Sequence, residues 1–275
     1  MKGQVVLITG ANTGIGRVTA RELARQGAHV FIACRSAERA RAVVDENRAG
    51  DQRGSVELLN LDLGDLDSVR QCADTFLARG LPLHLLINNA GLAGARGMTQ
   101  SGFELAFGVN HVGHFLLTQL LLERILASAP ARIVTVASRA HYRATAMDWE
   151  ALRRSTGSRT GLAEYGVSKL ANVLFSAELS RRLKGTGVST YALHPGVVAT
   201  DVWRSVPWPI RSLIKLGMIS TEEGALTTLY CSTSAEVAQQ TGLYYDQCKA
   251  KEPSRLGRDP ALAAELWRRT EDWLR

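Results

Sequence analysis

The chain has 275 residues, 45% of them hydrophobic and 21% charged, which is enough apolar sequence to bury one substantial core. The formal net charge of +7 suggests a nucleic-acid or acidic-surface binder as a competing hypothesis. The arginines are scattered among acids, however, as in 35–41, and this mixed pattern is typical of solvated helix faces. The four cysteines form no close pair and no metal-ligand spacing, so they predict reduced thiols in a cytosolic protein and no metal site.

The first predicted elements form a phosphate-binding unit. Residues 4–9 (Gln-Val-Val-Leu-Ile-Thr) are an apolar, β-branched run typical of a strand, and a helical pattern follows over 14–27. Between them, Gly10-Ala11-Asn12-Thr13-Gly14-Ile15-Gly16 has the spacing G-x-x-x-G-x-G, which differs from the usual G-x-G-x-x-G. Glycines allow a tight turn, and the N–H groups at a helix start favour a phosphate.

Strands and helices alternate along the rest of the chain. We predict strands at 4–9, 29–33, 55–59, 83–88, 131–137, 187–193 and 241–245, and helices at 14–27, 37–48, 66–79, 100–127, 165–183 and 221–232. This alternation predicts one Rossmann-like, doubly wound α/β domain with a seven-stranded, mainly parallel sheet and helices on both faces. Ligands then bind at the carboxyl ends of the strands, with dinucleotide binding mainly in 1–130 and catalysis and substrate binding in 131–275.

The residue after the second strand indicates which dinucleotide is bound. An Asp or Glu there selects NAD, whereas an Arg accommodates the 2′-phosphate of NADP. Arg35 occupies this position and Ser36 follows as a possible helper, so we expect NADP(H). The alternative is that Arg35 simply begins a solvated helix.

Tyr165 and Lys169 lie four residues apart on the helix predicted at 165–183, so their side chains share a face. A fixed positive charge favours the phenolate and lowers the pKa of a tyrosine towards neutrality. The pair therefore predicts an acid–base group, although the same spacing also occurs on ordinary solvated helices.

Six motifs with these residues occur in order: Thr9-Gly10-Ala11-Asn12-Thr13-Gly14-Ile15-Gly16, Asn88-Asn89-Ala90-Gly91, Asn110, Ser138, Tyr165-Gly166-Val167-Ser168-Lys169 and Pro195-Gly196-Val197-Val198-Ala199-Thr200. In these motifs, and over nearly its whole length, the chain resembles the short-chain dehydrogenase/reductase family. The stretches 33–35, 109–118 and 194–198 are most similar to its retinol dehydrogenase branch, which implies an apolar alcohol or carbonyl substrate.

The resemblance implies a set of cofactor contacts and a catalytic tetrad. The expected NADP(H) contacts are Gly10, Asn12, Thr13, Gly14, Ile15, Gly16, Arg35, Ser36, Asp62, Leu63, Asn89, Ala90, Gly91, Tyr165, Lys169, Pro195, Gly196, Val198 and Thr200. The expected catalytic residues are Asn110, Ser138, Tyr165 and Lys169. Tyr165 acts as general acid or base, Ser138 holds the substrate oxygen, Lys169 assists Tyr165 and binds the nicotinamide ribose, and Asn110 organises a proton path. Taken singly, the serine and the asparagine also fit helix-cap positions.

Substrate contacts are expected from Ser138, Tyr165, His141, Trp203 and Trp208. His141 fits a helix cap or the surface equally well. The segment 202–219 combines two tryptophans with an amphipathic apolar series, and three interpretations stay open: a core helix, a membrane-surface helix, and a lid over a long apolar substrate.

These observations predict an NADP(H)-dependent oxidoreductase acting on a small apolar alcohol/carbonyl pair, without nucleic-acid partners. The alternatives are a catalytically idle, NADP-sensing protein on the same scaffold and a nucleotide-sugar epimerase. Retinol dehydrogenases often carry an N-terminal membrane segment, whereas the first strand here starts by residue 4, so we expect a soluble, cytoplasmic protein, with peripheral membrane contact left open. The resemblance also implies a homo-oligomer, a dimer or a tetramer.

Overall fold

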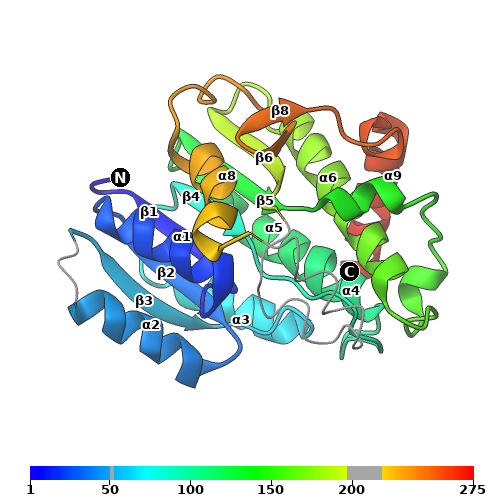
Figure 1. Cartoon of the computed structure of the whole chain (residues 1–275), viewed down its shortest axis with the longest axis horizontal. Helices are drawn as coiled ribbons and strands as arrows, with labels where there is room; N and C mark the ends of the chain where they lie inside the picture. Colours follow the sequence, from blue (N-terminus) through cyan, green and yellow to red (C-terminus); the bar gives the residue numbers. More distant parts are fainter. Residues whose placement is uncertain (50–52, 197–218) are drawn as a thin grey trace.

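The protein is described here by a computed structural model that covers residues 1–49, 53–196 and 219–275. Within these residues one sheet has the strand order β3-β2-β1-β4-β5-β6-β7-β8 (Figure 1). Its strands are β1 (Val5–Thr9), β2 (His29–Cys34), β3 (Ser55–Asn60), β4 (Leu85–Asn88), β5 (Ala131–Val136), β6 (Val188–His194), β7 (Leu243–Asp246) and β8 (Lys249–Lys251). The predicted Rossmann-like, mainly parallel architecture is confirmed, but the sheet has eight strands where seven were expected.

The additional strand, β8, is antiparallel to β7 and forms the edge of the sheet, with Tyr244 opposite Lys251. Its three residues are all exposed, so it has no apolar pattern from which a strand could be predicted. Lysines on an edge strand discourage pairing with a further strand, which suits this position.

Helices cover both faces of the sheet (Figure 1). They are α1 (Gly14–Arg25), α2 (Ala37–Ala49), α3 (Leu66–Leu77), α4 (Leu105–Phe107), α5 (Gly113–Leu126), α6 (Leu162–Arg182), α8 (Thr221–Thr233) and α9 (Pro260–Leu274). Alternate side chains of β1 divide between two cores: Val6 and Ile8 pack with residues of α1, α2 and α8, and Val5 and Leu7 with residues of α3, α5 and α6. The two-residue period of a buried strand therefore fixes which helices lie on which face.

The predicted helix at 100–127 begins later than expected and is irregular. It runs as α4, a π-helical segment at Gly108–Val112 and then α5. By length and composition Leu105–Leu126 is the one stretch among the described residues that could cross a membrane, yet 72% of its most apolar window is buried, as in the core helix of a globular domain. Short π-helical segments often occur at functional sites, and this one contains Asn110.

The C-terminal helix α9 was not predicted. Asp259 caps its N-terminus by accepting hydrogen bonds from the N–H groups of Ala261 and Leu262, and Pro260 occupies the first turn, where it needs no N–H partner.

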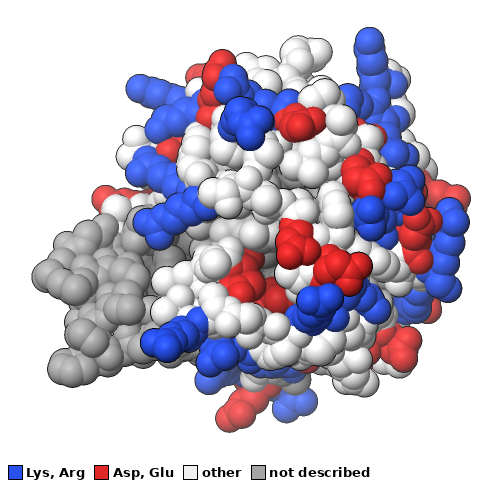
Figure 2. Space-filling model, turned by 90° about the vertical axis from the view of Figure 1, so that its right-hand side faces the viewer, with Lys and Arg blue, Asp and Glu red and all other residues white. Residues whose placement is uncertain are grey.

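Figure 2 shows the side of the molecule that is on the right in Figure 1, and basic and acidic side chains are interspersed over it.

Trp267 anchors α9 to the core. Its ring stacks on Phe175 of α6 with centroids 5.8 Å apart, meets Phe115 of α5 at 4.8 Å, and lies under the Arg182 guanidinium at 4.3 Å. Only 4% of this residue is exposed. Replacing it with a small residue would leave a cavity between three helices.

We therefore predict that Trp267→Ala lowers the free energy of unfolding by about 3–5 kcal/mol, the usual cost of truncating a buried tryptophan. Urea unfolding followed by circular dichroism measures the change. Leu226→Ala on α8, where the residue is 56% exposed, should change stability by less than about 0.5 kcal/mol. Equal, small losses in the two variants would show that α9 does not contribute to the core.

Candidate active site

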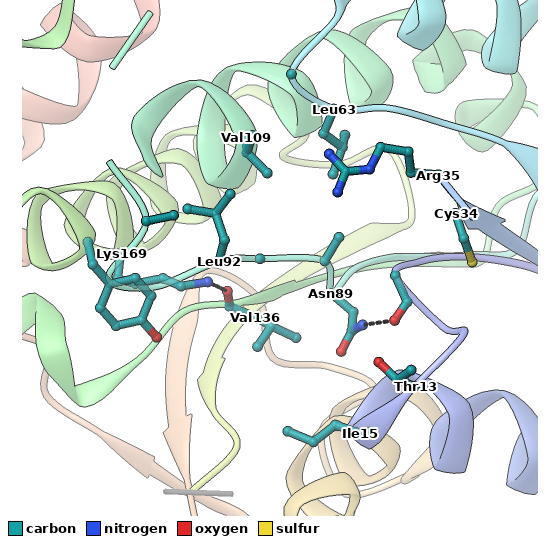
Figure 3. Close-up of a pocket in the computed structure, with 18 of the residues that line it drawn as sticks. Thr13, Ile15, Cys34, Arg35, Leu63, Asn89, Leu92, Val109, Val136 and Lys169 are labelled. Carbon is teal, nitrogen blue, oxygen red and sulfur yellow. Dashed lines mark hydrogen bonds between the residues drawn. The ribbon is translucent and has the colours of Figure 1, made fainter. Parts of the chain in front are cut away.

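A cavity of about 720 Å³ opens at the carboxyl ends of the parallel strands. Of the predicted site residues it is lined by Gly10, Asn12, Thr13, Gly14, Ile15, Gly16, Arg35, Ser36, Asp62, Leu63, Asn89, Ala90, Gly91, Ser138, Tyr165, Lys169, Pro195 and Gly196. Figure 3 shows Lys169 and Val136 at one end of this cavity and Cys34 and Arg35 at the other. The structure thus brings together residues from the ends of six strands, β1 to β6, and from two helices, α1 and α6.

The glycine turn lets two backbone segments approach each other. Gly10 has φ +68°, which glycine adopts without strain, and a Cβ at this position would lie 2.8 Å from the Cα of Ala90. At the start of α1 the Thr13 side chain makes no capping hydrogen bond, and no acidic residue occupies the first turn. The positive end of the helix dipole and its N–H groups therefore face the cavity, as in sites that bind phosphate.

A buried hydrogen-bond network connects this turn to Asn110. The Thr9 hydroxyl oxygen accepts hydrogen bonds from the N–H groups of Asn89 and Ala90, at 3.0 and 2.9 Å. His114 Nε2 lies 2.8 Å from the same hydroxyl, and His114 Nδ1 lies 3.0 Å from the carbonyl oxygen of Asn110. Because a carbonyl only accepts, the proton is on Nδ1, and the Thr9 hydroxyl donates to Nε2. Burial lowers the pKa of His114 to about 4, which keeps this ring neutral.

The side chain of Asn110 is held within the protein and does not line the cavity. Its amide nitrogen donates to the Leu92 carbonyl at 3.0 Å and to the Ser168 hydroxyl at 2.9 Å, and its amide oxygen accepts from the Leu92 N–H. These contacts place Asn110 behind Gly91, where an added Cβ would lie 3.3 Å from the Asn110 amide oxygen and 3.4 Å from Lys169 Nζ.

Ser138, Tyr165 and Lys169 meet on the cavity wall. The Ser138 oxygen accepts from the Ala140 N–H at 3.1 Å, so the residue does cap a short 3₁₀ turn, Arg139–Arg143 (η2), and its side chain also hydrogen-bonds Tyr165. Lys169 Nζ lies 5.7 Å from the centre of the Tyr165 ring and donates to the Val136 carbonyl at 2.8 Å. The functional and the capping interpretations of Ser138 are therefore compatible.

Burial dominates the ionisation of this pair, which corrects one expectation. The pKa of Tyr165 is raised by burial, against the lowering effect of its hydrogen bond with Ser138, whereas proximity to Lys169 was expected to lower it. Burial likewise lowers the pKa of Lys169 to about 7. Removing a charged group from water disfavours its charged form, and this effect is the largest one on the pKa of both side chains.

At the opposite end of the cavity, Arg35 projects from the end of β2 with 70% of its side chain exposed, and its Nη1 lies 3.6 Å from Asp62 Oδ2. Arg39, one turn further along α2, also lines the cavity and was not predicted. An arginine at this spacing after Arg35 was a usable sequence signal. Thr9 and His114, which hold the backbone of the site, lie within the motif at 9–16 and the stretch 109–118, but neither was predicted to act in the site.

The remaining predicted residues fall into two groups. His141 is fully buried and is not among the lining residues; its ring nitrogens contact the Ser138 carbonyl oxygen and the Ser254 N–H. This placement does not support the predicted substrate contact, because both ring nitrogens already have protein partners. Val198, Thr200, Trp203 and Trp208 lie outside the described residues.

Comparison with known proteins identifies the family. The sequence profile described as "short chain dehydrogenase" matches residues 4–149. Mouse (Mus musculus) retinol dehydrogenase 12 is 45% identical over 273 residues, which cover 96% of this chain and 84% of the relative. The chain belongs to the short-chain dehydrogenase/reductase family. Its similarity is to the retinol dehydrogenase branch.

Solved structures agree with this assignment. The crystal structure of an uncharacterized Mycobacterium paratuberculosis protein is 35% identical, with a TM-score of 0.78, and the match covers 99% of this chain and 93% of that one. A Beutenbergia cavernae protein described as an NAD(P)-dependent gluconate 5-dehydrogenase, with NADP bound at low occupancy, is 28% identical with a TM-score of 0.71, over 90% of this chain and 96% of that one. The family is one of oxidoreductases, and the fold is that of proteins that bind NAD(P).

The depressed pKa of Lys169 predicts a pH dependence of stability. Between pH 7 and the ordinary lysine value of 10.5, the unfolded chain binds more protons at this residue than the native protein does. Stability contributed by Lys169 therefore rises with pH over this window. Relative to Lys169→Met, the free energy of unfolding of the wild type should increase by roughly 1–3 kcal/mol from pH 7 to pH 9.

Urea unfolding at the two pH values measures this difference. Lys184→Met, which removes an exposed lysine just beyond the same helix, should retain the wild-type pH dependence. Parallel pH profiles for the wild type and Lys169→Met would contradict the depressed pKa.

Proposed function

We propose that the protein is an NADP(H)-dependent oxidoreductase that interconverts an apolar alcohol and its carbonyl compound, with a retinol/retinal-like, steroid-like or other lipophilic substrate. The observation that carries this proposal is the juxtaposition of Ser138, Tyr165 and Lys169 at one end of a cavity whose other end has a phosphate-binding turn and an arginine. The relatives named as retinol dehydrogenases support the apolar substrate.

The residues present fit a nicotinamide dinucleotide. The Gly10 turn and the α1 N-terminus suit a pyrophosphate, and Gly91 leaves open the space that a side chain would otherwise fill beside Lys169. Asp62 and Leu63 lie on the same wall as Arg35, where the adenosine part belongs, and Pro195 and Gly196 lie near the catalytic end. When bound, the nicotinamide supplies or accepts the hydride.

The protein side chains then handle the proton. Because its pKa is raised, the Tyr165 phenol keeps its proton at neutral pH and is suited to donate it to a carbonyl oxygen during reduction. In alcohol oxidation the same oxygen receives the proton. The Ser138 hydroxyl orients the substrate oxygen, and protonated Lys169 stabilises the phenolate that forms on Tyr165. Asn110, fixed by Leu92 and Ser168, holds the wall behind Gly91 and Lys169.

Arg35 supports NADP(H) as the cofactor. It stands at the carboxyl end of β2, where an acid would instead accept a hydrogen bond from the 2′-hydroxyl group of NAD. Its weak, largely exposed ion pair with Asp62 leaves the guanidinium available for a phosphate, and Arg39 lines the same part of the cavity.

Tyr165→Phe tests the chemistry, because it removes the transferable proton while preserving the ring. With all-trans-retinal and NADPH, turnover should fall by about 10²–10⁴-fold, and NADPH binding should be unchanged. Tyr230→Phe, which removes a hydroxyl that donates to Glu236 on the surface, is the matched control. Wild-type turnover in a folded Tyr165→Phe variant would remove Tyr165 from the catalytic role.

Arg35→Ala tests the cofactor. A charge-assisted contact with the 2′-phosphate contributes about 1.5–3 kcal/mol, so the wild type should prefer NADPH to NADH by tenfold or more, and the variant should lose most of this preference. Titration of nucleotide fluorescence measures both dissociation constants. Arg41→Ala, on the exposed side of α2, should behave as the wild type. An unchanged NADPH/NADH ratio in Arg35→Ala would overturn the NADP assignment.

A further inference from the structure

The turn that carries Ser138 is tied to a distant part of the chain. It is the 3₁₀ turn η2 (Arg139–Arg143), and three of its side chains contact the segment 246–254, which comprises the end of β7, β8 and the residues after it. Tyr142 donates its hydroxyl to the Glu252 carbonyl at 2.5 Å, His141 reaches Ser254, and Arg139 reaches Asp246. We call 246–254 the C-terminal brace.

The His141 contact holds the backbone of Ser138 itself. His141 Nδ1 lies 2.6 Å from the Ser138 carbonyl oxygen, which can only accept, so the ring proton is on Nδ1. Nε2 is then an acceptor and receives the Ser254 N–H at 3.1 Å. Burial lowers the pKa of His141, so the neutral ring that this arrangement requires is the stable form. One imidazole thus links the brace to the backbone of the predicted catalytic serine.

Arg139 forms an ion pair with Asp246, and the Asp246 side chain is buried. Asp246 Oδ2 accepts from Arg139 Nε at 2.8 Å and from Lys251 Nζ at 2.9 Å, and the Asp246 side chain is only 4% exposed, against 51% for Arg139 and 42% for Lys251. Although burial opposes it, these two hydrogen bonds lower the pKa of Asp246, so the carboxylate is ionised at neutral pH. Charge-assisted hydrogen bonds to a buried carboxylate are among the stronger polar contacts.

Asp246, the last residue of β7, connects the sheet to the η2 turn. It pairs in register with His194, a residue that lines the cavity, so the backbone of Asp246 is fixed beside the last residue of β6. Arg139 follows Ser138 directly, and the Ala140 N–H donates to the Ser138 hydroxyl oxygen. A displacement of Arg139 would therefore move both the backbone and the hydroxyl of Ser138.

We infer that Asp246 is a positioning residue, which acts through Arg139 to hold the Ser138 hydroxyl against the cavity. This inference rests on the proposed function, in which Ser138 orients the substrate oxygen. Asp246 contacts neither substrate nor cofactor in this account. It fixes the orientation of a residue that does, and small errors in such orientation are costly to turnover.

The ion pair offers a matched set of variants. Asp246→Asn removes the carboxylate charge, Arg139→Gln removes the same contact from its exposed end, and the double variant tests whether the two act together. Lys251→Gln removes the other cation on the same carboxylate oxygen but leaves the contact to the turn, so it is the control.

Amide hydrogen exchange reports the position of the turn without any ligand. The Ala140 and His141 N–H groups bond to the hydroxyl and the carbonyl oxygen of Ser138, at 3.1 Å each. Asp246→Asn and Arg139→Gln should each accelerate exchange of these amides on the order of tenfold. The double variant should accelerate exchange no more than either single variant does. Lys251→Gln should accelerate it less than about twofold. Wild-type exchange in both single variants, or acceleration by Lys251→Gln equal to that by Asp246→Asn, would overturn the inference.

Turnover of all-trans-retinal with NADPH separates positioning from general destabilisation. Asp246→Asn should lower kcat on the order of tenfold with an unchanged dissociation constant for NADPH, and Lys251→Gln should keep wild-type kcat. Ser138→Ala serves as the reference. If Ser138→Ala keeps wild-type kcat, the proposed function fails; if Ser138→Ala is impaired and Asp246→Asn is not, only the positioning role fails.

Discussion

The hydroxyl group of Thr9 joins the segments on which the whole cavity depends. Thr9 is the last residue of β1. Its hydroxyl oxygen accepts hydrogen bonds from the N–H groups of Asn89 and Ala90, which follow β4. The same hydroxyl donates to His114, which in turn holds the carbonyl of Asn110. Because one hydroxyl accepts two hydrogen bonds and donates a third, the glycine turn, the wall at Asn89–Gly91 and the π-helical segment are fixed relative to one another. A dinucleotide that contacts the first two segments is thereby placed against the third.

Burial sets the electrostatic character of the catalytic end. Tyr165 and Lys169 are both almost fully enclosed, and the protein accommodates the ammonium group through the Val136 carbonyl. Burial raises the pKa of Tyr165, and it lowers the pKa of Lys169 to about 7. Perturbed pKa values are typical of functional sites, and a lysine with its pKa near the working pH exchanges a proton readily. The stability of the domain and the proton transfer that we propose for it therefore depend on the same buried contacts.

The sequence was sufficient for the seven longer strands, because each contains an apolar or β-branched run, and six of them end at a predicted site residue. It was insufficient for β8, whose exposed Lys-Ala-Lys has no pattern, and for α9, whose position depends on Trp267 packing between helices far away in the sequence. About half of the lining residues were predicted, since short motifs at strand ends carry them, but the part of the wall formed by Leu92, Ala95, Met98, Thr99, Gln100, Leu105 and Val109 was not. The pKa of Tyr165 and the contact of His141 with Ser254 were not, because burial and pairing across 113 residues leave no local signal.

The most direct test of the account is the transfer of a labelled hydride. The protein is incubated with all-trans-retinal and NADPH that carries deuterium at both positions of nicotinamide C4, and the alcohol product is analysed by mass spectrometry. Retinol that contains one deuterium, on the carbon that bears the hydroxyl group, is the predicted result. Retinol without deuterium, or no alcohol from retinal or from a panel of other apolar ketones and aldehydes, would contradict hydride transfer in this cavity.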